Sequence, residues 1–169
     1  MSNWMWVLFL LGLFLLVVLL FRKPLHKQAY RLFFNWVLQD KEVPIKKVNE
    51  IKAGEKLDIL DTRAPKEFEV SHIEGARRFG FEKKQWHLLD EVGKEDTILA
   101  YCTVGYRSQQ VVKELREKGY ENVYNLKGGL FEWMHRGRPI FRDGQRTKAV
   151  HTYNRSWGMW LSEGEKVYE

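Results

Sequence analysis

The stretch TILAYCTVGYRS, residues 97–108, decides the fold of this chain. It opens with five residues, Thr97 to Tyr101, that are mostly apolar or β-branched and favour a buried strand. A helical pattern runs from Ser108 to Lys118. The loop between them has Cys102 at its entrance and Arg107 at its exit. The stretch therefore predicts a strand, a tight loop and a helix in succession.

The loop of this stretch has the features of a cradle for a thiolate. Backbone N–H groups of a glycine-containing loop and of a helix N-terminus can converge on one point and favour an anion there. Gly105 permits a turn where a Cβ would clash, Arg107 adds fixed positive charge, and Ser108 can cap the helix or bond the sulfur. Because the thiolate is the nucleophilic form of cysteine, we expect Cys102 to be the reactive group.

The length of the loop points to sulfur chemistry. Four residues, Thr103 to Tyr106, separate Cys102 from Arg107. Phosphatases that attack phosphorus with a thiolate need one residue more to surround a tetrahedral phosphate. The shorter loop fits a bound persulfide sulfur better than a phosphoryl group, so a phosphatase is disfavoured.

The rest of the central chain predicts an α/β fold. Because strands alternate with short helices from Pro44 onward, we expect a mostly parallel sheet covered by helices. Active sites of such sheets lie beyond the carboxyl ends of the strands, where both Asp61 and Cys102 fall. The expected strands are 57–61, 76–81, 97–101 and 122–126, and the expected helices begin near Val48, at Pro65, near Trp86, at Ser108 and at Leu130.

Several of these segments resemble the rhodanese-like sulfurtransferase family, in the family's order and at its spacing. The resemblance covers roughly residues 44–140 and implies a small domain with a five-stranded parallel core. The matching segments are Leu57-Asp58-Ile59-Leu60-Asp61-Thr62-Arg63, Glu67-Phe68, His72-Ile73-Glu74-Gly75-Ala76, Tyr101-Cys102 through Gly105 with Arg107-Ser108, and Leu126-Lys127-Gly128-Gly129-Leu130 with Trp133.

The resemblance also implies a reaction. Cys102 would attack the outer sulfur of a donor such as thiosulfate, become a persulfide, and pass that sulfur to a thiophilic acceptor such as cyanide or a thiol, including a protein thiol. Arg107 and the amides of residues 103–108 would stabilise the persulfide. Asp61 and Arg63 match the family's acid and base near the site, where they order the loop or meet the substrate. No metal or cofactor is expected.

The chain departs from the family pattern at the loop. Thr103 and Val104 stand where polar or basic residues are common, and Tyr106 stands where a small polar residue is common. Ser71 replaces a usual glycine before His72, which affects a turn. The loop residues shape donor specificity, so the identity of the donor stays open.

The N-terminus predicts a membrane anchor. Trp4 to Phe21 carries no charge and is about long enough to cross a bilayer core. Arg22 and Lys23 follow it, which predicts a single span with the N-terminus outside and the catalytic domain cytoplasmic. A buried core helix and an uncleaved signal are the alternatives. We expect the segments to be an anchor at 1–21, a basic-aromatic juxtamembrane segment at 22–43, the domain at 44–140 and a tail at 141–169.

Two of these segments have open interpretations. The juxtamembrane segment suits a helix at the membrane surface with its cations near lipid headgroups, or a helix packed on the domain with Trp36 in its core. The aromatic tail packs on the domain or touches the membrane. The basic residues at 22–31 are more typical of a segment that sets membrane orientation and contacts lipid headgroups than of a nucleic-acid-binding segment.

Composition narrows the remaining possibilities. A single cysteine excludes an internal disulfide and a zinc site built on several thiolates. Besides a sulfurtransferase, the sequence is compatible with a membrane-tethered binding or scaffold module with little turnover. A thiol redox sensor is a third hypothesis, which requires a resolving thiol from another molecule.

Overall fold

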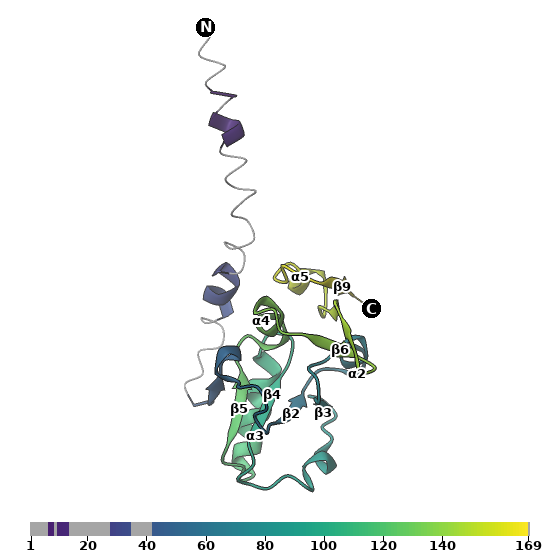
Figure 1. Cartoon of the computed structure of the whole chain (residues 1–169). Coiled ribbons are helices and arrows are strands. Elements are labelled where there is room, and N and C mark those ends of the chain that lie inside the picture. The colour runs from purple at the N-terminus through teal and green to yellow at the C-terminus, as the bar shows by residue number, and fades with distance from the viewer. Residues whose placement is uncertain (1–6, 9, 14–27, 35–41, 169) are drawn as a thin grey trace.

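The computed structural model describes residues 7–8, 10–13, 28–34 and 42–168. Its centre is a five-stranded sheet in the order β1-β5-β4-β2-β3, and each neighbouring pair of strands is parallel (Figure 1). This arrangement confirms the expected α/β fold with a parallel sheet. The strands are β1 (Ile45–Lys46), β2 (Asp58–Asp61), β3 (Arg77–Arg78), β4 (Ile98–Tyr101) and β5 (Val123–Leu126).

Helices flank this sheet close to where the sequence pattern predicts them. The α-helices are α2 (Pro65–Val70), α3 (Tyr106–Glu117) and α4 (Gly129–His135). Two further expected helices are short 3₁₀ turns, η1 (Val48–Glu50) and η2 (Trp86–Leu89). The expected strand at 76–81 is confined to β3, because Gly80 has a φ of +80° and turns the chain out of the strand.

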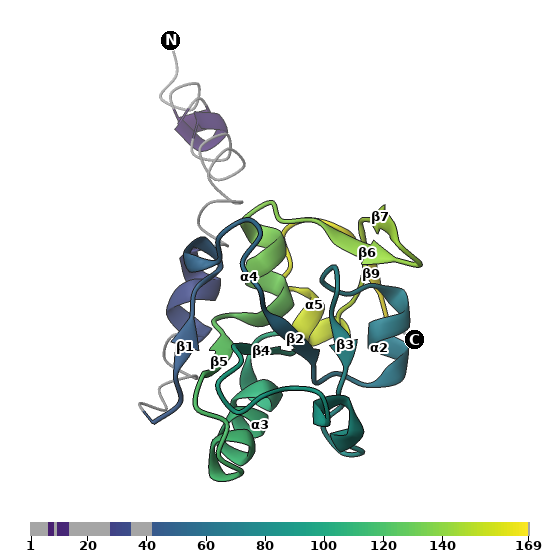
Figure 2. The same ribbon diagram turned by 60° about the horizontal axis from the view of Figure 1, so that its bottom comes forward.

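The two faces of β4 define two cores. Ile98 and Ala100 belong to a cluster with α3, whereas Leu99 and Tyr101 belong to a cluster with α4. Figure 2 shows these two helices on opposite sides of the sheet. All four strand residues are fully buried, as the continuous apolar run predicts for a central parallel strand. The carboxyl end of β4 therefore lies between two packed layers.

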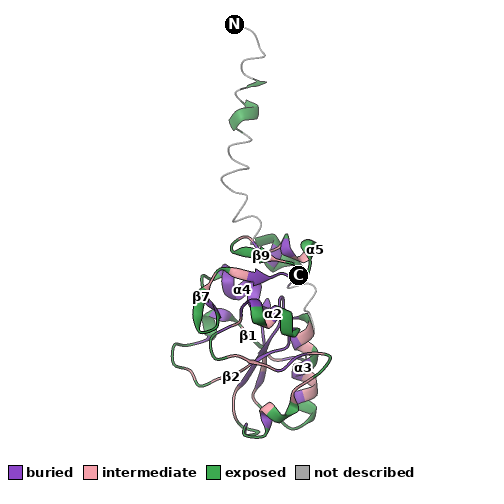
Figure 3. Cartoon of the chain, turned by 90° about the vertical axis from the view of Figure 1, so that its right-hand side faces the viewer, coloured by how far each residue is buried: buried purple, intermediate pink, exposed green. Residues whose placement is uncertain are grey.

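The helical segment at residues 28–34 packs on the α4 side of the domain. Tyr30 and Phe34 are buried, and the Tyr30 hydroxyl donates to the Gly128 carbonyl at 2.5 Å. Figure 3 shows α4, which this segment contacts, as buried throughout. Packing on the domain is thus the interpretation that the structure supports for residues 28–34, while Trp36 lies outside the described residues.

The C-terminal segment folds back on the domain. β6 (Ile140–Arg142) and β7 (Gln145–Thr147) form an antiparallel pair, and β8 (Ala149–His151) pairs in parallel with β9 (Glu165–Val167). Between β8 and β9, α5 (Arg155–Gly158) begins at Asn154, whose side chain accepts the Trp157 N–H. Trp157 and Trp160 pack against the buried cluster beside α4. Strands of three residues are too short to give a recognisable period, so the sequence did not predict them.

The predicted membrane anchor falls mostly outside the residues that the structure describes. Of Trp4 to Phe21, only residues 7–8 and 10–13 are described, and they are helical. Within the described part of the chain, no helix combines the length and apolar character needed to cross a membrane. The anchor therefore stays a prediction from hydropathy.

Candidate functional site

Cys102 lies at the carboxyl end of β4 and at the N-terminal end of α3. Its side chain is buried, and its Sγ accepts a hydrogen bond from the Gly105 N–H at 3.1 Å. Gly105 has a φ of +103°, which a residue with a Cβ adopts only under strain. Because α3 begins at Tyr106, the sulfur also faces the positive end of a helix dipole. The backbone thus turns at Gly105 in a conformation that suits glycine.

The first turn of α4 holds the other side of the loop. Leu130 N–H donates to the Cys102 carbonyl at 2.9 Å, and Phe131 N–H donates to the Thr103 carbonyl at 3.1 Å. Gly129 has a φ of +56°, and a Cβ there would collide with the Cys102 carbonyl oxygen. The Gly-Gly pair was visible in the sequence, but its role as a clamp for the cysteine loop was not predicted.

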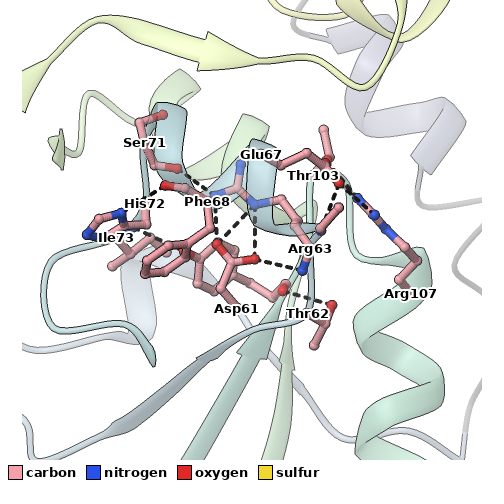
Figure 4. Close-up of polar contacts among 12 residues, drawn as sticks. Asp61, Thr62, Arg63, Glu67, Phe68, Ser71, His72, Ile73, Thr103 and Arg107 are labelled. Atoms are coloured by element: carbon pink, nitrogen blue, oxygen red, sulfur yellow. Dashed lines mark hydrogen bonds and ion pairs between the residues drawn. The ribbon is translucent and has the colours of Figure 1, made fainter. Parts of the chain in front are cut away.

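Arg107 does not point freely at an incoming anion. Its guanidinium forms two hydrogen bonds of 2.8 Å to the two carboxylate oxygens of Glu67 and a third of 3.2 Å to Thr103 Oγ1. Figure 4 shows Arg107 reaching from α3 to Glu67 and Thr103. Burial lowers the pKa of the Arg107 guanidinium, but the hydrogen bonds to Glu67 and the charge of that carboxylate raise it by more, so the pKa lies above its ordinary value. Arg107 stays charged and ties the loop to α2.

Glu67 is a site residue that was expected only as part of the Glu67-Phe68 segment of the family resemblance. Its side chain is 3% exposed, and its Oε1 also accepts from Thr103 Oγ1 at 3.0 Å. Burial raises the pKa of Glu67, but the hydrogen bonds and charge of Arg107 outweigh it and hold the pKa below its ordinary value. One feature of the sequence could have indicated a structural role for Glu67: it is the third residue of the predicted helix, where a carboxylate can accept a backbone N–H at the helix start. In the structure it accepts the Ala64 N–H at 3.1 Å.

Asp61 and Arg63 form a fully buried ion pair beneath the site. Arg63 Nη2 lies 2.6 Å from Asp61 Oδ2 and donates to the Ser71 carbonyl, also at 2.6 Å (Figure 4). Both side chains are 0% exposed. Of the two roles that the sequence left open, ordering of the loop suits Asp61, because its carboxylate is enclosed by the arginine.

The Ser108 hydroxyl is directed away from the sulfur. It donates to Asn125 Oδ1 at 2.7 Å, and Asn125 Nδ2 donates to the Gly105 carbonyl at 2.9 Å. Gly105 is the N-cap residue of α3, and no side chain caps the start of this helix. Ser108 therefore supports the loop through Asn125, whereas the sequence suggested capping or a bond to the sulfur.

A cavity of about 750 Å³ opens over the cysteine. The sequence-predicted residues Cys102, Arg63, Arg107, Thr103, Val104 and Tyr106 all line it. Asp61, Gly105 and Ser108 are not part of the lining and act from behind it. Thr103 and Val104 are buried, whereas Tyr106 is 55% exposed at the rim. The structure thus brings the loop residues together around one accessible volume.

Comparison with known proteins agrees with this geometry. Residues 45–136 match the model of the rhodanese-like domain. The chain is 32% identical over 100 residues to the uncharacterised protein YqhL of Bacillus subtilis, with 59% of this chain and 79% of that protein covered. It is 34% identical over 93 residues to the thiosulfate sulfurtransferase GlpE of Coxiella burnetii, with 52% of this chain and 86% of that protein covered.

Other relatives and one solved structure extend the comparison. A tRNA uridine(34) hydroxylase of Erwinia tasmaniensis is 33% identical over 84 residues, which cover 47% of this chain but only 24% of the hydroxylase. The solution structure of a rhodanese-like domain from Anabaena superposes with a TM-score of 0.54 at 29% identity, covering 60% of this chain and 80% of that domain. With its parallel sheet and its buried cysteine after β4, the chain belongs to the rhodanese-like family of sulfur-transfer-related domains.

Proposed function

We propose that this protein is a sulfurtransferase that carries sulfur as a persulfide on Cys102. The observation that carries the proposal is the position of Cys102 Sγ, which lines the cavity and accepts the Gly105 N–H at the N-terminus of α3. A thiolate at this position is stabilised by the backbone donor and the helix dipole, and so is the terminal sulfur of a persulfide.

The transfer proceeds in two balanced displacements. The Cys102 thiolate attacks the outer sulfur of the donor, a new S–S bond forms, and the donor's S–S bond breaks with its electron pair on the leaving group. With thiosulfate the leaving group is sulfite. A thiophilic acceptor then attacks the outer sulfur of the persulfide and releases the Cys102 thiolate. With the Cys102 thiolate as nucleophile and an anionic acceptor such as cyanide or a thiolate, neither displacement transfers a proton.

The surrounding residues position the loop for these steps. The Glu67–Arg107 pair joins the loop to α2, and the N–H groups of Leu130 and Phe131 hold the loop carbonyls of Cys102 and Thr103. These contacts keep Cys102 Sγ in place while the persulfide sulfur is added and removed. Positioning of this kind is a general source of rate enhancement.

The experiment follows the sulfur atom directly. The full-length chain is incubated with thiosulfate or with a polysulfide, and intact mass spectrometry measures the addition of one sulfur atom to Cys102. Cyanide is then added, and thiocyanate is quantified. We expect the added mass and thiocyanate formation with the wild type and neither with Cys102→Ser. The proposal fails if the wild type shows no added sulfur with either donor and no thiocyanate above the variant's level.

We also propose that the domain works at the cytoplasmic face of a membrane, held by Trp4 to Phe21. The support is the uncharged length of this segment and the basic residues that follow it. Cell fractionation and protease protection of a C-terminally tagged chain test the idea. Recovery of the chain in the soluble fraction, or protection of the tag on the opposite side of the membrane, would contradict it.

A further inference from the structure

The cavity over Cys102 has a wall that comes from outside the family domain. Phe34 from the N-terminal helical segment and Tyr153 and Trp157 from the C-terminal segment all line it. These residues lie beyond the matched range 45–136. The Phe34 and Trp157 rings are 5.8 Å apart, so the two terminal segments meet at the cavity.

This wall is attached to the cysteine loop. The Arg107 guanidinium lies 5.5 Å from the centre of the Tyr153 ring, in the range of a cation–π interaction. Tyr153 has a φ of +68°, which is unusual for a residue that is not glycine, and its N–H donates to His151 Nδ1 at 3.0 Å. Strained conformations of this kind persist where the surroundings hold them, and they cluster at ligand sites. Tyr153 is 56% exposed and lines the cavity.

The volume and the lining exceed what a small inorganic donor uses. About 750 Å³ falls within the range of about 300–1,000 Å³ that is typical of pockets for organic ligands. Thiosulfate is a single tetrahedral anion and would occupy only the part next to Cys102. The remaining volume is bounded by apolar and aromatic side chains, among them Val104, Phe81 and Tyr106.

Positively charged side chains also line this cavity. Arg78 and Lys83 both line it, and within the described part of the chain neither forms an ion pair. Glu82 also lines the cavity and is acidic. The Glu67 carboxylate is already neutralised by Arg107. The lining of the cavity therefore combines cationic side chains with an aromatic wall.

We propose that the sulfur donor is an anionic sulfane-sulfur compound with an apolar organic group, which packs against Phe34, Tyr153 and Trp157. This inference rests on the sulfurtransferase function proposed above. In the reaction the Cys102 thiolate attacks the terminal sulfur, the S–S bond of the donor breaks, and the organic fragment leaves with the electron pair, as a sulfinate when the donor is a thiosulfonate. The aromatic wall holds that fragment before and during the displacement.

Two thiosulfonates with the same reactive head test the proposal. Benzenethiosulfonate and methanethiosulfonate differ only in their organic group. To correct for the intrinsic reactivity of each donor, its rate of Cys102 persulfidation is divided by its rate of reaction with a free small thiol. For the full-length wild type we expect kcat/KM to favour the benzene compound at least tenfold after this correction, equivalent to about 1.4 kcal/mol. Tyr153→Ala and Trp157→Ala should each reduce this preference at least threefold. Met159→Ala, an exposed residue of the same segment outside the lining, should leave it unchanged.

A binding measurement separates failure of the donor class from failure of the chemistry. Full-length Cys102→Ser is titrated calorimetrically with benzenesulfinate and methanesulfinate, the two leaving groups. We expect benzenesulfinate to bind at least tenfold more tightly and Tyr153→Ala to remove most of that difference. Equal affinity for the two sulfinates, or equal corrected rates with the two thiosulfonates, overturns the donor class. In that case, persulfidation of Cys102 by both thiosulfonates still upholds the proposed function. If neither thiosulfonate transfers sulfur while thiosulfate or a polysulfide does, the donor class is wrong and the proposed function stands. If none of these donors adds sulfur to Cys102, the proposed function itself fails.

Discussion

Replacement of Gly129 by alanine tests the clamp between α4 and the cysteine loop. The residue has a φ of +56°, and its missing Cβ leaves room for the carbonyls of Cys102 and Thr103. An alanine Cβ would lie 2.8 Å from the Thr103 carbonyl oxygen and still closer to the Cys102 oxygen. Both contacts are with backbone, so no flexible side chain can move aside. The loop must shift, and the hydrogen bonds from Leu130 and Phe131 must weaken.

The expected loss of stability combines three effects. An alanine in the left-handed region costs about 1–2 kcal/mol, and overpacking against backbone costs about 1–3 kcal/mol. Each of the two hydrogen bonds contributes about 0.5–1.5 kcal/mol. These contributions reach about 3–8 kcal/mol if both hydrogen bonds are lost. Because the bonds weaken rather than break, we expect Gly129→Ala to lower the free energy of unfolding by about 4 kcal/mol, in the lower part of that range. Gly137 lies beyond the other end of α4 with a φ of +73° and no atom within 4 Å of its ideal Cβ, so Gly137→Ala should cost only about 1–2 kcal/mol.

Urea denaturation of the two full-length variants measures this difference, and the rate of Cys102 alkylation by a small iodoacetamide reagent reports on the loop. We expect Gly129→Ala to change the alkylation rate at urea concentrations far below its unfolding midpoint and Gly137→Ala to leave it as in the wild type. Equal destabilisation by the two substitutions, together with unchanged reactivity of Cys102, would refute the clamp.

Three further substitutions have defined outcomes. The folded-state pKa of Glu67 is depressed, so its contribution to stability is present above its unfolded pKa of about 4.3 and is lost as the pH falls toward the lower folded pKa. Urea denaturation between pH 3 and 7 should therefore show that the free energy of unfolding of Glu67→Gln falls less steeply with acid than that of the wild type. An equal pH dependence in the two proteins would show that the pair with Arg107 is not linked to stability. Asp61→Asn leaves a buried arginine without its counter-ion and should cost about 3–5 kcal/mol in the same assay; a loss below about 1 kcal/mol would contradict the buried pair. Tyr30→Phe removes the hydrogen bond to the Gly128 carbonyl and should cost about 1 kcal/mol, and an unchanged unfolding midpoint would argue against docking of the helical segment at residues 28–34.

The sequence analysis was most accurate where the pattern was local. The expected helix at Pro65 to Val70 coincides with α2, and the expected strand at 97–101 contains β4. The prediction was least accurate in the C-terminal segment, where residues 140–142 and 149–151 form strands of only three residues. Short strands carry no periodicity of their own and are defined by the partner to which they bond.

The role of Arg107 shows why the site was only partly predictable. A cation at the end of the loop was expected to face the thiolate and an incoming anion. Its actual partner, Glu67, is 40 residues away along the chain. The sequence predicts Glu67 on a helix and Arg107 at the end of the loop, but only the folded chain brings α2 and the first turn of α3 close enough for bidentate contact between the carboxylate and the guanidinium. Pairings across that distance leave no local pattern.

The sequence by itself determined the strand, the four-residue loop and the helix that present Cys102, together with the family to which the domain belongs. These features depend on hydrophobic periodicity and on spacing within a few residues, which a sequence displays directly. Only the tertiary structure decided that α4 clamps the loop, that Glu67 neutralises Arg107, and that Phe34 and Trp157 meet over the cysteine. Those contacts join residues distant in the chain, so they form only when the sheet and its helices have packed.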